Sequence, residues 1–104
     1  MHALSPASLF DLQGRVAFVP GGYGDIGTAI ARGLALAGAR VAVAGRSLDK
    51  AQALAAMLRA EGHDALGLAM DAHRVEDITR AVDAAAAHFG RLDLLVNCVG
   101  MQRE

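Results

Sequence analysis

The sequence predicts an α/β fold in which a parallel sheet lies between helices on both of its faces. Four short apolar runs, at residues 15–19, 40–44, 65–69 and 92–96, alternate with three longer segments of helical periodicity. The first three runs are apolar at nearly every central position, so both faces of each strand must be covered, which is typical of parallel sheets. Right-handed crossovers between such strands favour the strand order 3-2-1-4.

The first predicted helix occupies residues 26–37, after the first strand and a glycine-rich turn. The positions that recur at helical spacing would form its inward face: Ile26, Ile30, Gly33, Leu34 and Ala37. Gly38 stands where a glycine often ends a helix, and the second predicted strand follows it.

The second predicted helix begins after Ser47, which can cap it, and ends at Gly62. Its inward positions would be Leu48, Ala51, Leu54, Ala55 and Leu58. The third predicted helix covers residues 75–89 and ends before Gly90. Its inward positions would be Ile78, Val82, Ala85 and Phe89. With the last two strands, the order is βαβαβαβ.

Composition excludes several classes of protein. The 104 residues have the size of one small domain, and a net charge of -1 gives no general attraction to nucleic acid or to anionic membranes. No apolar stretch approaches the ~20 residues of a membrane span. Residues 1–14 lack the basic start and long apolar centre of a secretory signal. A single cysteine, Cys98, forms no internal disulfide, so we expect a cytoplasmic protein.

The strongest functional signal is the turn at residues 20–27, which has the sequence Pro-Gly-Gly-Tyr-Gly-Asp-Ile-Gly. Glycines between a strand and a helix let backbone N–H groups approach a phosphate, and the N-terminus of the helix adds a favourable partial charge. An ordinary turn is the alternative interpretation. The position between the first strand and the first helix favours phosphate binding and a Rossmann-type sheet.

The end of the second strand indicates which nucleotide would bind. Sites that select NAD usually place a carboxylate there for the ribose 2′-hydroxyl, whereas an arginine suits the 2′-phosphate of NADP. This chain has Gly45 at that position and Arg46 next to it. A solvated loop arginine is the alternative, but we predict NADP, with NAD as the second choice.

Polar residues also follow the third and fourth strands. Asp71 can accept a hydrogen bond from the adenine amine, with the N–H of Ala72 donating to the ring, or it can cap the following helix. Residues 97–100 close the fourth strand, and the carboxyl ends of parallel strands face the ligand crevice. We therefore expect them near the cofactor.

At these residues the sequence resembles the short-chain dehydrogenase/reductase family. The leading motif of that family, T-G-x-x-x-G-I-G, corresponds to residues 20–27, with Pro20 in place of the threonine and Asp25 in place of the middle glycine. Gly24 also gives this turn the G-x-x-G-x-x-G spacing of the extended branch of the family.

The second motif of the family, N-N-A-G, corresponds to residues 97–100. Here Cys98 and Val99 replace the second asparagine and the alanine. The preceding residues 92–96 are close to the usual sequence of the main branch, which we favour.

The resemblance implies reversible hydride transfer between a nicotinamide dinucleotide and a small alcohol or carbonyl compound, in a protein that is a homo-oligomer at full length. It implies that the phosphates are surrounded by Gly21, Tyr23, Gly24, Asp25, Ile26 and Gly27. It places Arg46 and Ser47 at the adenosine ribose, and Asp71 and Ala72 at adenine. It places Asn97, Val99 and Gly100 on the ribose–nicotinamide side.

The catalytic groups of that family do not occur in these 104 residues. There a tyrosine assisted by a lysine protonates the oxygen and a serine orients it, but here the only tyrosine and lysine are Tyr23 and Lys50. We predict no catalytic residue and no turnover by this chain alone. We expect residues 1–104 to be the N-terminal part of one dinucleotide-binding domain, truncated after the fourth strand and without its catalytic half.

Other titratable residues give no second site. The four histidines His2, His63, His73 and His88 lack the spacing of metal ligands, so we predict no bound metal. Cys98 has no nearby histidine and is interpreted as a buried thiol at a strand end.

Two alternative functions remain at this point. One is a non-catalytic NADP-binding sensor or interaction module of the same fold. The other is a methyltransferase dependent on S-adenosylmethionine, which Arg46 argues against because such enzymes usually place an acid near that strand end.

Overall fold

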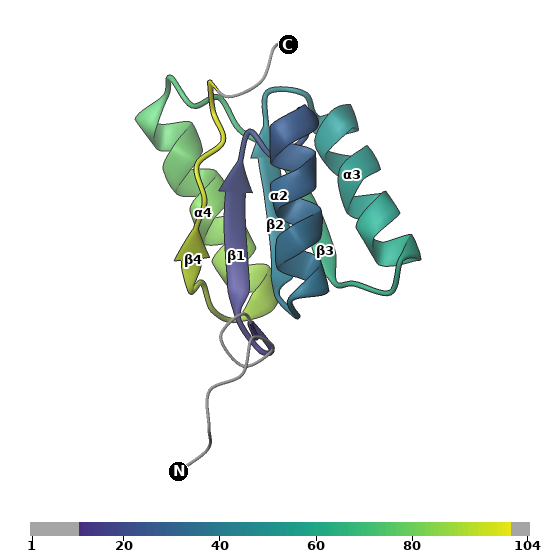
Figure 1. Ribbon diagram of the computed structural model, residues 1–104. Helices are drawn as coiled ribbons and strands as arrows, with labels where there is room; N and C mark the ends of the chain where they lie inside the picture. Colours follow the sequence, from purple (N-terminus) through teal and green to yellow (C-terminus); the bar gives the residue numbers. More distant parts are fainter. Residues whose placement is uncertain (1–10, 101–104) are drawn as a thin grey trace.

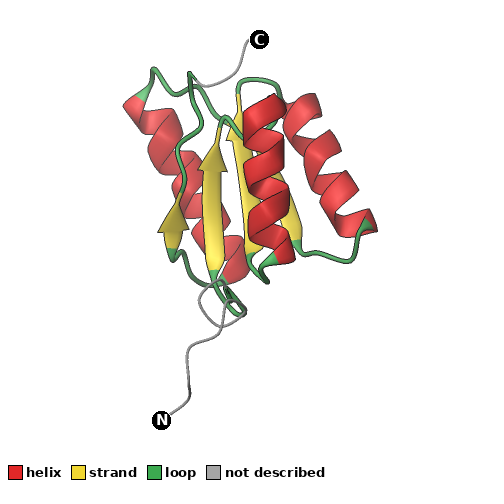
Figure 2. Ribbon diagram, in the orientation of Figure 1, coloured by secondary structure: helices red, strands yellow, loops and turns green. Residues whose placement is uncertain are grey.

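The computed structural model describes residues 11–100, which form a four-stranded sheet with helices on both faces (Figures 1 and 2). The strands are β1 (Val16–Pro20), β2 (Arg40–Gly45), β3 (Ala65–Ala69) and β4 (Leu94–Leu95). They lie in the order β3-β2-β1-β4 and every pairing is parallel. The predicted fold class and strand order are confirmed.

Both faces of the central strands are buried, as their composition predicted. In β1, Ala17 and Val19 pack on the side of the first two helices, whereas Val16 and Phe18 pack on the side of the third. All five residues of β1 are buried. The alternation places two separate cores on the two faces of one sheet, which stabilises a three-layer arrangement.

Three helices connect the strands: α2 (Asp25–Leu36), α3 (Leu48–Ala60) and α4 (Val75–Phe89). In Figure 2, α2 and α3 lie on one face of the sheet and α4 lies on the other. The Ser47 hydroxyl accepts a hydrogen bond of 3.2 Å from the N–H of Lys50, so the predicted cap of α3 is confirmed.

The inward face of α2 differs from the prediction. Gly27, Ala31 and Ala35 are its buried residues, with Ile30 and Leu34 packed beside them. The predicted inward positions Ile26 and Gly33 are exposed, so that part of the prediction was wrong. At its start, α2 approaches the turn after β1 so closely that a Cβ on Gly27 would lie 2.6 Å from the carbonyl oxygen of Gly21, so the small residue Gly27 faces inward there and Ile26 does not.

Leu48 also departs from the prediction, because 42% of its surface is exposed. It is the first residue of α3, and the four other predicted inward positions of that helix are buried. Leu48 stands directly after the cap residue Ser47, where the helix begins, so that part of the prediction was wrong.

The fourth strand is shorter than residues 92–96, but the chain continues to follow β1 beyond it. The N–H of Val96 donates to the carbonyl of Phe18 at 3.0 Å, and the N–H of Cys98 donates to that of Pro20 at 2.8 Å. Before the strand, the Asp93 carboxylate accepts a hydrogen bond of 2.8 Å from the N–H of Val16. This register brings the residues after β4 to the carboxyl end of β1.

Asp93 is held in place by charge as well as by the backbone. Its carboxylate lies 2.7 Å from the Arg91 guanidinium and 3.7 Å from that of Arg15. The hydrogen bond from Arg91, followed by that from the N–H of Val16, lowers the pKa of Asp93 below its usual value. The carboxylate therefore stays ionised and links β4 to the start of β1.

Candidate functional site

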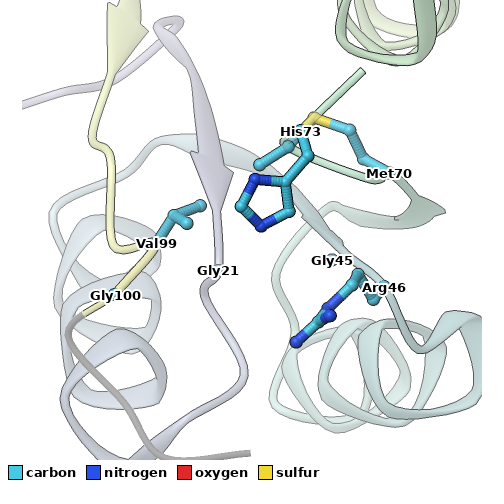
Figure 3. Close-up of a pocket in the computed structure, with 8 residues that line it drawn as sticks. Gly21, Gly45, Arg46, Met70, His73, Val99 and Gly100 are labelled. Carbon is cyan, nitrogen blue, oxygen red and sulfur yellow. The ribbon is translucent and has the colours of Figure 1, made fainter.

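A cleft of about 470 Å³ opens at the carboxyl ends of the parallel strands (Figure 3). In an open parallel sheet this edge is where ligands bind. The residues that line the cleft come from the ends of β1 and β2, the loop after β3 and the segment after β4: Gly21, Gly45, Arg46, Met70, Ala72, His73, Val99 and Gly100.

Five of the predicted site residues therefore meet around one opening: Gly21, Arg46, Ala72, Val99 and Gly100. They belong to four segments that are far apart in the sequence. The remaining predicted residues are not among those that line the cleft. Tyr23 and Gly24 lie in the β1–α2 turn, and Asp25, Ile26 and Gly27 form the first turn of α2. Ser47, Asp71 and Asn97 lie within two residues, in sequence, of residues that line it.

The turn after β1 is compact because glycines bring three backbone segments together. The N–H of Gly21 donates to the carbonyl of Ala44 at 2.6 Å. A Cβ placed on Gly21 would lie 2.7 Å from the backbone nitrogen of Val99, and one placed on Gly27 would lie 2.6 Å from the carbonyl oxygen of Gly21. No side chain fits at either position, so backbone rather than side chains forms this wall of the cleft.

Helix α2 begins at this turn without a side-chain cap. Gly24 is its N-cap residue and offers no side-chain oxygen, whereas Ser47 caps α3. The first backbone hydrogen bond joins the N–H of Thr28 to the carbonyl of Gly24 at 2.7 Å. The N–H groups of the first turn can therefore donate to an anion, although Asp25 in that turn opposes one.

The Tyr23 side chain leaves the turn and lies over the end of β2. Its hydroxyl oxygen accepts a hydrogen bond of 3.2 Å from the N–H of Ser47, and the Lys50 ammonium lies 5.8 Å from the centre of its ring. Ser47 therefore takes part in two hydrogen bonds: its N–H donates to the Tyr23 hydroxyl, and its own hydroxyl accepts from the N–H of Lys50 as the cap of α3.

The loop after β3 is fixed by α4. The N–H of Asp71 donates to the Asp77 carboxylate, and Arg80 donates both to that carboxylate at 2.8 Å and to the carbonyl of Ala69 at 2.6 Å. The N–H of Asp71, followed by Arg80, lowers the pKa of Asp77. An ionised Asp77 therefore anchors the backbone that carries Asp71 and Ala72.

Asp71 has a hydrogen-bonding role within the β3–α4 loop. Its carboxylate accepts a hydrogen bond of 2.9 Å from the N–H of His73, but the N-cap residue of α4 is Arg74. Asp71 therefore closes a short turn ahead of the helix and does not cap it. Contact with adenine stays a prediction.

Three cleft residues were not among the predicted site residues. The first is Gly45, which stands out in the sequence only because it lacks the carboxylate of NAD-selective sites. The other two are Met70 and His73, which flank the predicted residues Asp71 and Ala72. In Figure 3 the His73 ring lies between the ends of β1 and β2, and Arg46 extends toward the same opening. The spacing of the four histidines predicts no metal site and says nothing of other roles of His73. The signal in the sequence that indicates its place at the cleft is its position in the β3–α4 loop, after the carboxyl end of β3.

After β4, Asn97 and Cys98 have structural partners. The side-chain oxygen of Asn97 accepts a hydrogen bond of 3.0 Å from the N–H of Val99, which shapes the backbone beside the cleft. Cys98 is fully buried, and burial raises the pKa of its thiol. A protonated, buried thiol is a poor nucleophile, which agrees with its interpretation as a core residue.

Residues 11–100 contain neither a membrane-spanning helix nor a cluster of metal ligands. No helix in this part of the chain has the length and apolar character needed to cross a bilayer. In the same residues, no three histidine, cysteine, aspartate or glutamate side chains come together so that they could hold a metal ion.

Comparison with known proteins agrees with this arrangement. The family model described as short chain dehydrogenase matches residues 15–104. The chain belongs to the short-chain dehydrogenase family. D-threitol dehydrogenase of Mycolicibacterium smegmatis is 43% identical over 94 residues, which are 90% of this chain and 36% of that protein. The chain thus spans about a third of the length of the curated relatives that it matches.

Solved structures of the family share the fold. A short-chain dehydrogenase/reductase from Serratia marcescens is 44% identical with a TM-score of 0.77, covering 83% of this chain and 36% of that one. Hydroxysteroid dehydrogenase from Escherichia coli is 30% identical with a TM-score of 0.82, covering 85% of this chain and 37% of that one. The βαβαβαβ unit described above is the part that these members of the family have in common with this chain.

Proposed function

We propose that the chain binds NADP(H) as the cofactor half of an oxidoreductase that interconverts a small alcohol and its carbonyl compound. The observation that carries the proposal is the cleft at the carboxyl ends of the strands, which is lined by Arg46, directly after β2, and by glycine at position 45. The family model is described as short chain dehydrogenase, and relatives of the chain are named as dehydrogenases or reductases, which supports the reaction class.

The residues present fit a dinucleotide. Gly21 and Gly27 leave room where a Cβ would meet backbone, so a phosphate can approach the turn closely. The N-terminus of α2 has no side-chain cap and can offer N–H groups to an anion. The cleft of about 470 Å³ has a volume that is ordinary for a small-molecule site.

In this proposal each segment of the cleft holds one part of the cofactor. The turn that contains Gly21, Tyr23, Gly24, Asp25, Ile26 and Gly27 holds the phosphates. Arg46 and Ser47 hold the adenosine ribose, and Asp71 and Ala72 hold adenine. Asn97, Val99 and Gly100 border the ribose and nicotinamide. The nicotinamide ring, when bound, supplies or accepts the hydride.

The preference for NADP over NAD is expected to depend on Arg46. A guanidinium can meet the 2′-phosphate with two charge-assisted hydrogen bonds, and no carboxylate at position 45 repels it. Asp25 in the first turn of α2 works against an anion. We expect a preference of about tenfold, or about 1.4 kcal/mol, and its loss in Arg46→Ala, measured by titrating NADPH and NADH against the whole protein.

A matched control is Arg32→Ala. Arg32 carries the same charge as Arg46 and lies on α2, where it pairs with Glu61 at 2.7 Å, away from the residues that line the cleft. This variant should keep the preference of the wild type. Equal affinities of the wild type for the two nucleotides, or an Arg46→Ala variant that keeps the preference, would contradict the assignment.

We propose further that residues 1–104 are the N-terminal part of one dinucleotide-binding domain and show no turnover alone. The family's tyrosine and lysine are separated by three residues, whereas Tyr23 lies in the phosphate turn and Lys50 on α3. Incubating the purified 104-residue chain with NADPH and a panel of aldehydes and ketones should leave the NADPH absorbance constant. A decrease proportional to the amount of chain would refute this.

For the whole protein we propose a small alcohol or carbonyl substrate, a homo-oligomeric assembly and a cytoplasmic location. The names of the relatives support the substrate class, and the single cysteine suits a reducing compartment.

A further inference from the structure

The ring of Tyr23 lies where a side chain at position 45 would have to be. A Cβ placed on Gly45 would overlap the ring, 2.7 Å from Cζ and 2.8 Å from the hydroxyl oxygen of Tyr23. Gly45 is buried and is the last residue of β2, and its neighbour Arg46 extends toward the cleft. A residue of the phosphate turn therefore determines which amino acid can stand at the end of the second strand.

We propose that Tyr23 is a specificity-determining residue, whose ring fills the side-chain position at Gly45 and thereby keeps a carboxylate away from the adenosine 2′-position. The inference rests on the proposed binding of a dinucleotide. It goes beyond that function because it assigns the choice between NADP and NAD to a contact between the β1–α2 turn and β2, in addition to the arginine.

Two interactions keep the ring over Gly45. The Tyr23 hydroxyl oxygen accepts a hydrogen bond of 3.2 Å from the N–H of Ser47. The ammonium of Lys50, a residue of α3, lies 5.8 Å from the centre of the ring. Tyr23 also packs against the core between the sheet and the first two helices. Moving the ring away would give up the hydrogen bond, the cation–π contact and this packing together.

The consequence concerns substitutions at position 45. An aspartate there would need the space of the ring, so it would either displace Tyr23 or be turned away from the cleft. Its carboxylate could then not accept hydrogen bonds from the hydroxyls of the adenosine ribose. Once the ring is removed, the same aspartate has room at the strand end, where a carboxylate favours NAD.

The test is a double-mutant cycle in the whole protein that carries this chain. Wild type, Gly45→Asp, Tyr23→Ser and the double variant are titrated with NADH and NADPH, and their melting temperatures are measured without nucleotide. We expect Gly45→Asp alone to leave NADH affinity unimproved and to lower the melting temperature by about 2 to 4 °C, since the ring must move. In the Tyr23→Ser background, the aspartate should raise NADH affinity by about tenfold without a further loss of melting temperature.

Tyr23→Phe is the matched control, because it keeps the ring and removes only the hydroxyl. Combined with Gly45→Asp, it should behave like the tyrosine background. A gain in NADH affinity from Gly45→Asp alone, or the same gain in the phenylalanine background, would overturn the proposal. So would a double variant with no gain.

The melting temperatures separate this inference from the proposed function. If no variant binds either nucleotide, the proposed function fails. The contact between the ring and position 45 is then tested by the melting temperatures alone. A smaller loss of melting temperature from Gly45→Asp in the Tyr23→Ser background than in the wild type supports displacement of the ring by the aspartate. Equal losses in the two backgrounds overturn it.

Discussion

Replacing Gly27 by alanine is expected to lower the free energy of unfolding by about 2 kcal/mol and to weaken NADPH binding by about tenfold or more. A Cβ at this position would lie 2.6 Å from the carbonyl oxygen of Gly21 and 2.8 Å from two backbone carbons of Gly22. Those atoms are backbone and cannot rotate away. The helix must shift from the turn, and the turn forms the proposed phosphate site.

Gly33→Ala is the control for this variant, because Gly33 lies on the same helix with nothing within 4 Å of its Cβ position. Alanine is a better helix former than glycine, so this variant should be more stable than the wild type by about 0.5 to 1 kcal/mol and bind NADPH unchanged. Urea denaturation and NADPH titration of the two variants in the whole protein give the comparison. If Gly27→Ala also gains stability, the close contact between α2 and the turn does not exist.

The parallel sheet could be predicted because the relevant information is local. Strand β2 has five consecutive buried residues, and such a run has no solvent face that would require alternation. Helix ends were equally visible, since Ser47 caps α3 and Gly90 ends α4 in the left-handed region with a φ of +82°. Each signal involves residues within a few positions of one another.

The site was predicted less completely because its details come from residues distant in sequence. Ala31 and Ala35 belong to the contact face of α2, whereas the helical spacing counted from Ile26 predicts a face that is rotated by one residue. The contact between Tyr23 and Gly45 joins the turn after β1 to the end of β2, and the whole of α2 separates the two in the sequence. Periodicity specifies which element a residue belongs to, but the neighbours of a side chain depend on how elements pack.

Gly21→Ala is expected to lower the free energy of unfolding by about 3 kcal/mol, the sum of about 1 to 2 kcal/mol for a left-handed backbone and of overpacking. The φ of Gly21 is +73°, which L-residues rarely adopt, and its Cβ would lie 2.7 Å from the nitrogen of Val99. Its N–H also donates to the carbonyl of Ala44 at 2.6 Å. One methyl group would therefore disturb the ends of β1, β2 and the segment after β4 together.

Gly14→Ala separates the two contributions to that loss. Gly14 has a similar φ of +79° but nothing within 4 Å of its Cβ position, so its substitution should show the backbone term alone, about 1 to 2 kcal/mol. Gly14 lies before β1, at the edge of the sheet opposite the cleft, so Gly14→Ala should leave NADPH binding unchanged.

Gly21→Ala should weaken NADPH binding by about tenfold or more, because Gly21 and Val99 both line the cleft. Equal losses of stability in the two variants would mean that Val99 does not press on Gly21. Unchanged binding in Gly21→Ala would mean that the cleft at the strand ends is not the nucleotide site.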